Sequence, residues 1–182
     1  MTAGERIGWA DEMRVGLLGT VRRVWAPRGV KVRQVIQMRR EWQYLNLAAD
    51  VRAGRLWWCW AESMKGEELA SVVRGWRQET DLDAVVWDGA SGHRGPDVAA
   101  TGFPRVIQPP YAPELNPAER VFEELRRAVE GRGYPTLAAK VAAINAELER
   151  LEADPDRVRR LLGWAWIRDA LDQLPTAQQR AA

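Results

Sequence analysis

The sequence predicts an α/β fold: a mixed sheet that begins with an antiparallel meander, has flanking helices and is followed by a helical tail. Two observations support this prediction. Several strand-like runs precede the first helical pattern, so these strands are joined without a helix between them and should pair antiparallel. After that helix come a strand, a short helix, another strand and then only helical patterns.

The first predicted strand, residues 7–12, carries acids on both of its faces. Ile7, Trp9 and Asp11 alternate onto one face, and Glu12 falls on the other. Asp11 is therefore the acid that shares a face with large apolar side chains.

The remaining strands of the meander follow before residue 62. Residues 14–18 are a candidate partner for the first strand. The runs at 30–36 and 42–48 predict a hairpin around the polar tip 38–41. The continuous apolar run at 55–61 is typical of a strand buried on both faces.

The middle of the chain alternates between helix and strand. An i, i+3, i+4, i+7 pattern of apolar residues predicts a helix over 64–79. A short apolar strand at 84–87 ends at Asp88. A short helix at 97–101 and a strand at 105–108 follow.

A proline-rich loop then leads into a helix that carries one carboxylate at its start. Prolines disfavour regular structure before Asn116, which is a good N-cap, and Pro117 suits the first helical position. Glu119 stands three residues after the cap, so it either completes a capping box or serves chemistry. The helix has one apolar face, formed by Phe122, Leu125 and Val129.

The C-terminal part is predicted to be helical. We divide the chain into a core at 1–134, a helical extension packed on it at 135–174 and a frayed tail at 175–182. Asp154 and Pro155 begin a second helix of the extension, which runs through Leu171. The first helix carries the apolar stripe Leu137, Val141, Ile144, Leu148 and Leu151.

Composition excludes several classes of site. The 182 residues include one cysteine, Cys59, so no internal disulfide is available, and one histidine, His93, so a Cys/His zinc site is excluded. Any metal must therefore be held mainly by carboxylates. The sequence shows no signal peptide and no apolar run of membrane-spanning length, and we expect no membrane partner and a cytoplasmic location.

Charge by itself indicates little about partners. The net charge is only +2, too small to predict nucleic-acid binding. Arginine nevertheless dominates the 27 basic residues and suits bidentate phosphate contacts, although a GC-rich genome would produce the same bias. The only lysines are Lys31, Lys65 and Lys140.

The run Tyr-Ala-Pro-Glu-Leu-Asn-Pro-Ala-Glu at 111–119 resembles the signature of DDE transposases of the mariner superfamily and their bacterial insertion-sequence relatives. The resemblance covers residues 5–130 best and implies a ribonuclease-H-like fold. It also implies that Glu119 is the third catalytic carboxylate. The family's activity is cleavage of DNA at transposon ends and strand transfer to target DNA.

The other two acids of the resemblance are Asp88 and Asp11. Trp-Asp-Gly-Ala-Ser-Gly-His at 87–93 resembles the family's second aspartate motif, with Gly89 in place of the usual Asn. Asp-Glu at 11–12 resembles the first motif. Thirty residues lie between Asp88 and Glu119, a few fewer than is usual in the mariner group.

Three carboxylates fit phosphodiester chemistry. Charge develops on the attacking and leaving oxygens, and two divalent metal ions can stabilise both. Mg²⁺ or Mn²⁺ prefers carboxylate oxygens, and an ion relieves the mutual repulsion of crowded acids. We therefore expect two ions bound by Asp11, Asp88 and Glu119.

DNA, as transposon ends and target, is the expected partner, with a homodimer and a separate N-terminal helix-turn-helix segment or chain as further expectations. One alternative is a truncated, inactive transposase remnant that only binds DNA or assembles. Another is a different ribonuclease-H-like nuclease, acting on RNA:DNA hybrids or junctions. Candidate DNA contacts, each also explicable as an ordinary loop or surface residue, are His93, Arg120, Arg126, Arg127, Arg39 and Arg40.

Overall fold

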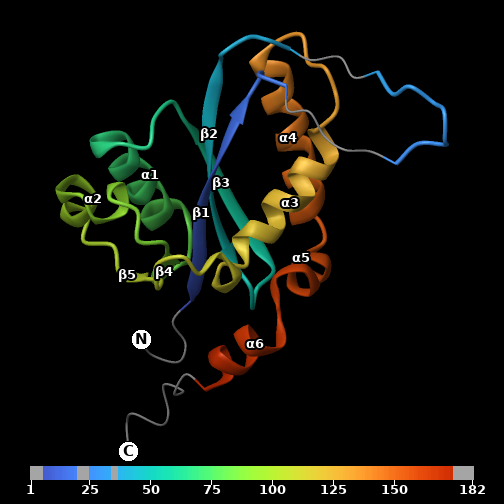
Figure 1. Ribbon diagram of the computed structural model, residues 1–182. Coiled ribbons are helices and arrows are strands. Elements are labelled where there is room, and N and C mark those ends of the chain that lie inside the picture. Colours follow the sequence, from blue (N-terminus) through green and yellow to red (C-terminus); the bar gives the residue numbers. More distant parts are fainter. Residues whose placement is uncertain (1–5, 20–24, 34–36, 174–182) are drawn as a thin grey trace, which may run out of the picture.

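A five-stranded mixed sheet runs through the middle of the molecule (Figure 1). The computed structural model describes residues 6–19, 25–33 and 37–173. The strand order is β3-β2-β1-β4-β5; β1, β2 and β3 form an antiparallel meander, while β4 and β5 run parallel to β1. The strands are β1 (Ile7–Gly16), β2 (Trp42–Asp50), β3 (Arg55–Ala61), β4 (Ala84–Trp87) and β5 (Arg105–Ile107).

Helices cover both faces of the sheet, as Figure 1 shows. On one face lie α1 (Gly66–Glu79) and α2 (Pro96–Ala100), with a short 3₁₀ turn at Gly92–Arg94 before α2. The other face is covered by α3 (Ala118–Val129), α4 (Leu137–Glu152), α5 (Pro155–Leu162) and α6 (Ala165–Asp172). The predicted α/β class, the meander and the helical C-terminal part are confirmed.

The meander differs from the prediction in its first hairpin. β1 extends unbroken to Gly16, so residues 14–16 continue the first strand instead of pairing with it. Its antiparallel partner is β2, with Asp11 opposite Leu47 and Gly16 opposite Trp42. Residues 30–33 form no strand, because the strand that pairs with β2 on this side is β1 itself. Residues 34–36 and the predicted frayed tail lie outside the described residues.

The edge position of β3 corrects a second prediction. Because β3 pairs on one side only, its central residues are half-buried and not fully enclosed. The indoles of Trp58 and Trp60 both donate to Oδ1 of Asn145 on α4, at 3.2 and 2.9 Å. Cys59 faces the α1 side, and burial there raises the pKa of its thiol to about 11.

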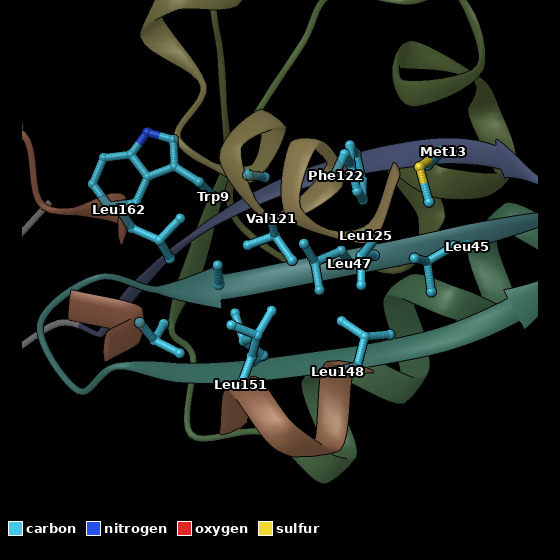
Figure 2. Close-up of a cluster of buried hydrophobic side chains, with 14 of the residues drawn as sticks. Trp9, Met13, Leu45, Leu47, Val121, Phe122, Leu125, Leu148, Leu151 and Leu162 are labelled. Carbon is cyan, nitrogen blue, oxygen red and sulfur yellow. The ribbon is translucent and has the colours of Figure 1, made fainter. Parts of the chain in front are cut away.

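The amphipathic stripes of α3 and α4 form the larger core. Figure 2 shows Val121 and Leu125 of α3 directed toward Leu47 of β2, with Leu148 and Leu151 of α4 in the same cluster. All five side chains are fully buried. This packing fixes the start of α3 over the sheet, so it also fixes the position of Glu119.

The last predicted helix is two helices. Asp154 caps α5 as expected, accepting a hydrogen bond from the Arg157 backbone N–H at 2.9 Å. The helix then ends at Leu162, because Gly163 and Trp164 leave helical geometry before α6 begins. None of the described helices is long and apolar enough to cross a membrane. The division of the chain at residue 134 stays a prediction.

We predict that Leu148→Ala lowers the free energy of unfolding by about 2–5 kcal/mol, because it removes buried methyl groups and leaves a cavity. Glu149→Ala, on the exposed side of the same helix, should change it by less than about 0.5 kcal/mol. Denaturant unfolding followed by circular dichroism measures both. Equal effects would show that α4 does not belong to the core.

Candidate active site

Parallel pairing of β1 with β4 brings two acids to the same edge of the sheet. Trp9 pairs with Val86, so Asp11 and Asp88 each lie two residues beyond that pair on adjacent strands. Asp11 therefore lies within β1 beside Asp88, which immediately follows the last residue of β4, and both acids line one cavity. The two acids are thus neighbours, as predicted, although Asp88 stands just beyond its strand.

Asn116 fastens the start of α3 to Asp11. Its side-chain Nδ2 donates to the backbone oxygen of Ala10 and to Oδ2 of Asp11, each at 3.0 Å. Its Oδ1 accepts the Ala118 backbone N–H at 3.1 Å, as expected of an N-cap. The cap was predictable from sequence, but the bond to Asp11 was not, because it joins residues 105 positions apart.

Asp11 is a largely buried carboxyl among other acids. Its pKa is raised from the ordinary 3.8 to about 7, chiefly by burial and also by the charges of Glu12, Glu119 and Asp88, against a lowering hydrogen bond from the Glu12 backbone N–H. The Glu119 and Asp88 carboxylates are therefore close enough to disfavour its ionised form. A bound cation would favour that form.

Asp88 is held by its own loop and by His93. Its Oδ1 accepts the Ala90 backbone N–H at 2.9 Å and lies 2.6 Å from Nδ1 of His93. Nδ1 also contacts the Asp88 backbone oxygen at 3.2 Å. The Asp88 side chain remains 51% exposed, so it is accessible at the edge of the sheet.

The prediction that His93 lies at the rim and contacts DNA is wrong. His93 is buried at 2% exposure, and its ring stacks on Trp87 with centroids 3.9 Å apart. Its Nε2 lies 3.1 Å from Oε2 of Glu12, and Nδ1 is occupied by Asp88. Both ring nitrogens thus face inward partners, which leaves neither for a phosphate.

Glu119 occupies the first turn of α3 and does not close a capping box. The Asn116 backbone N–H that such a box would bond is instead donated to Pro113 O at 2.9 Å. The Glu119 carboxylate, 39% exposed, lies 3.5 Å from Nη1 of Arg126. The sequence left open whether Glu119 completes a capping box or serves chemistry, and these contacts do not support the capping box.

A cavity of about 290 Å³ joins the three acids. Asp11, Asp88 and Glu119 all line it, together with Asn116 and the loop after β5. Gln108 fixes the two ends of that loop, since its backbone N–H donates to Trp87 O and its side chain to Leu115 O. Sequence patterns gave no signal for Gln108.

Two further residues shape the loops around this cavity. Tyr111 adopts a left-handed backbone, with φ of 58°, and is fully exposed. Arg94 donates to Gly89 O, and its guanidinium fills the space that a side chain at position 89 would occupy. The glycine that replaces the family's usual Asn is thus matched by an arginine five residues beyond it.

The predicted DNA-contacting arginines lie outside the cavity with partners of their own. Arg120 pairs with Glu123 and covers the Trp164 ring, while Arg127 pairs with Glu124. Arg39 donates to the Pro135 backbone oxygen and pairs with Glu41. Arg126 and Arg40 both line a second, larger hollow of about 490 Å³ between the end of β1 and helices α3 and α4.

The carboxylates of Asp11, Asp88 and Glu119 are the kind of ligand that hard divalent cations prefer, although their oxygens do not point at one common position. Within the described residues, no three acidic, histidine or cysteine side chains are grouped closely enough to hold a metal ion together. The reason lies in their contacts: Asp11 is bonded to Asn116, Asp88 contacts His93, and Glu119 pairs with Arg126. All three nonetheless line one cavity, and three carboxylates are oxygen donors of the kind that Mg²⁺ and Mn²⁺ prefer.

This mixed sheet with flanking helices is the ribonuclease-H-like fold, and it carries one acid within β1 and another directly after the parallel strand β4. The family model described as DDE superfamily endonuclease matches residues 6–139, more than half of the chain. The chain therefore belongs to the DDE superfamily endonucleases. No curated protein sequence matches it.

Solved structures with this fold include the Mos1 transposase paired-end complex with left transposon end, at 12% identity and a TM-score of 0.65. The alignment covers 93% of this chain and 54% of that one, so the chain spans about half the length of such transposases. The catalytic domain of Mos1 mariner transposase aligns with a TM-score of 0.60 at 12% identity, covering 93% of this chain and 80% of the domain. A mariner Mos1 paired-end complex with Mg aligns with a TM-score of 0.63 at 14% identity, covering 92% and 54%.

The raised pKa of Asp11 predicts that stability falls as pH rises. Between about pH 4 and pH 7 the folded state holds a proton that the unfolded state has released. This stabilising contribution is fully present below pH 4 and is lost by pH 7. It amounts to about 4 kcal/mol, because a pKa of about 7 against 3.8 is worth about 1.4 kcal/mol per pKa unit.

Asp11→Asn, which cannot ionise, removes this dependence. In EDTA, the free energy of unfolding of the variant relative to the wild type should rise between pH 5 and pH 8, whatever constant cost the substitution carries. Urea unfolding at the two pH values measures the difference. A gap that does not change with pH would contradict the raised pKa.

Proposed function

We propose that this chain is the catalytic domain of a transposase, which cleaves DNA at transposon ends and transfers the cut strand to target DNA with divalent metal ions. The observation that carries the proposal is the single cavity lined by Asp11, Asp88 and Glu119 in a member of the DDE endonuclease family. The Mos1 complexes contain transposon-end DNA and, in two cases, Mg or Mn, which supports the same substrate and ions here.

Two Mg²⁺ or Mn²⁺ ions would activate the attacking water or 3′-hydroxyl and stabilise the leaving oxygen. Asp11, Asp88 and Glu119 are the residues that would hold them. The rigid members of this set are the two aspartates, because Asp11 lies within a paired strand, Asp88 directly follows one, and both are fixed by hydrogen bonds.

Glu119 is the adjustable member. Its carboxylate pairs with Arg126, at 3.5 Å, and both side chains are about two-fifths exposed. An ion pair this exposed contributes little stability. Glu119 can therefore leave Arg126 for an ion at small cost, and the first turn of α3 limits how far its carboxylate can move.

The larger hollow beside α3 supports a path for DNA. Four basic side chains line it: Arg14, Arg40, Arg126 and Lys140. Arg126 lines this hollow and also pairs with Glu119, which lines the smaller cavity. The hollow and the cavity are therefore neighbours. Phosphates seated along this surface would lead toward the three carboxylates.

The two alternatives differ in measurable ways. An inactive remnant would keep the fold and bind DNA without cutting it. A nuclease for RNA:DNA hybrids or junctions would cut those substrates in preference to duplex DNA. Homodimer formation and a separate helix-turn-helix segment that reads the transposon ends remain predictions of the transposase proposal.

We expect Mn²⁺- or Mg²⁺-dependent nicking of supercoiled plasmid. Asp11→Asn, Asp88→Asn and Glu119→Gln should each reduce the nicking rate at least about 100-fold, because metal-ion charge stabilisation is worth several kcal/mol. Glu123→Gln is the matched control, since Glu123 lies one turn further along α3 and pairs with Arg120 outside the cavity. Gel separation of nicked from supercoiled plasmid gives the rates.

Each outcome selects one interpretation. Nicking that survives all three substitutions would sink the assignment of the triad. If the protein binds metal but does not nick DNA, a separate segment that recognises the DNA ends is required. If it neither binds metal nor nicks DNA, the inactive remnant is favoured. Loss of activity in Glu123→Gln but not Glu119→Gln would move the third carboxylate to Glu123.

Arg126→Gln should weaken binding of a short DNA duplex and reduce the slope of log affinity against log salt by about one, because one phosphate contact is lost. Arg74→Gln is the control: Arg74 is equally exposed, at 42% against 43%, but lies on α1 over the other face of the sheet. Fluorescence anisotropy across a salt series measures both slopes. Identical slopes for the two variants would remove Arg126 from the DNA path.

A further inference from the structure

Behind Asp88, on the α1 side of the sheet, lies a buried acid–histidine pair. Glu12 follows Asp11 on β1 but points to the opposite face, where its side chain is 10% exposed. Its Oε1 accepts the Trp87 indole N–H at 2.9 Å, and its Oε2 lies 3.1 Å from Nε2 of His93. The His93 ring then reaches Asp88 through Nδ1.

The two ring nitrogens of His93 face different acids. Nδ1 faces the backbone oxygen and Oδ1 of Asp88, and Nε2 faces the carboxyl group of Glu12. The ring therefore bridges Glu12 and Asp88.

Such an arrangement is a poor source of stability. Polar groups taken out of water carry a desolvation cost that their mutual hydrogen bonds do not reliably repay, and apolar replacements of the same volume are often neutral or stabilising. The neighbouring positions show that this face accepts apolar residues, because Ala10, Ala48 and Val85 are buried in the same layer. A buried polar pair in contact with Asp88 therefore points to a role at that acid.

We propose that His93, anchored by Glu12, is a positioning residue for Asp88. Nδ1 fixes the backbone oxygen and Oδ1 of Asp88, and the Ala90 N–H bonds Oδ1 from the other side. None of these contacts uses Oδ2, so the array orients the carboxylate with Oδ2 available in the cavity. The inference rests on the proposed function, in which Oδ2 would be a ligand of the divalent ion.

The array mirrors the arrangement around Asp11. Asn116 holds Asp11 from the α3 side of the sheet, and the Glu12–His93 pair holds Asp88 from the α1 side. Outer partners that orient metal ligands typically change metal affinity or activity 10–100-fold when they are removed.

Because His93 is the only histidine, its ring can be observed without catalysis. In ¹⁵N-labelled protein with EDTA, long-range proton–nitrogen correlations show one imidazole. Asp88→Asn should shift the Nδ1 resonance more than Nε2, and Glu12→Gln should do the reverse. An Nδ1 resonance unchanged by Asp88→Asn would overturn the proposal.

The second arm measures Mn²⁺ binding by calorimetry. His93→Phe keeps the ring on Trp87 but removes both donors, and should raise the Kd for Mn²⁺ about 10–100-fold. His93→Asn, whose amide nitrogen stands near the place of Nδ1, should recover part of the loss. Val98→Ala, a cavity variant of the same buried layer, should lower Tm with little change in Kd.

Failure of this inference differs from failure of the proposed function. If the wild type and His93→Phe bind Mn²⁺ equally well, only the positioning role is overturned. Wild type that neither binds Mn²⁺ nor nicks DNA overturns both. A weakened His93→Phe whose nicking rate returns at high Mn²⁺, with unchanged Tm, supports positioning over a merely structural role.

Discussion

The parallel pairing of β1 with β4 is the constraint on which the rest of this structure depends. It sets Asp11, within β1, level with Asp88, which directly follows β4. The paired strands thus provide the rigidity with which the two acids face one cavity. The third acid reaches the same cavity only because α3 is packed against that sheet by Val121, Phe122 and Leu125.

Alternation along β1 gives one dipeptide two functions. Asp11 points to the face covered by α3, and Glu12 points to the face covered by α1 and α2. The first enters the cavity and the second enters a buried polar cluster with Trp87 and His93. A shift of one residue in the register of β1 would exchange these roles, so the long pairing with β2, from Gly8 to Gly16, also protects the site.

The C-terminal helices serve the site indirectly. α4 and α5 complete the core under α3, and Asn145 of α4 satisfies two indoles of the edge strand β3. That strand has an open side, and its half-buried tryptophans require such partners. The helices thus hold together the face of the sheet on which Asp11 and Glu119 meet.

The sequence by itself determined the class of fold, the strand that contains Asp11, the strand that Asp88 follows, and the capped helix that presents Glu119. These follow from local rules: alternation, helical periodicity and the conformations of proline and asparagine. Long-range contacts were beyond such rules, so the strand predicted to pair with residues 42–48 was wrong over its described residues 30–33, and the partners of His93, Asn116 and Gln108 were not foreseen. Only the tertiary structure decided that His93 faces inward to Glu12 and Asp88 and that Glu119 pairs with Arg126, because these contacts join residues that the pairing of strands and the packing of helices bring together.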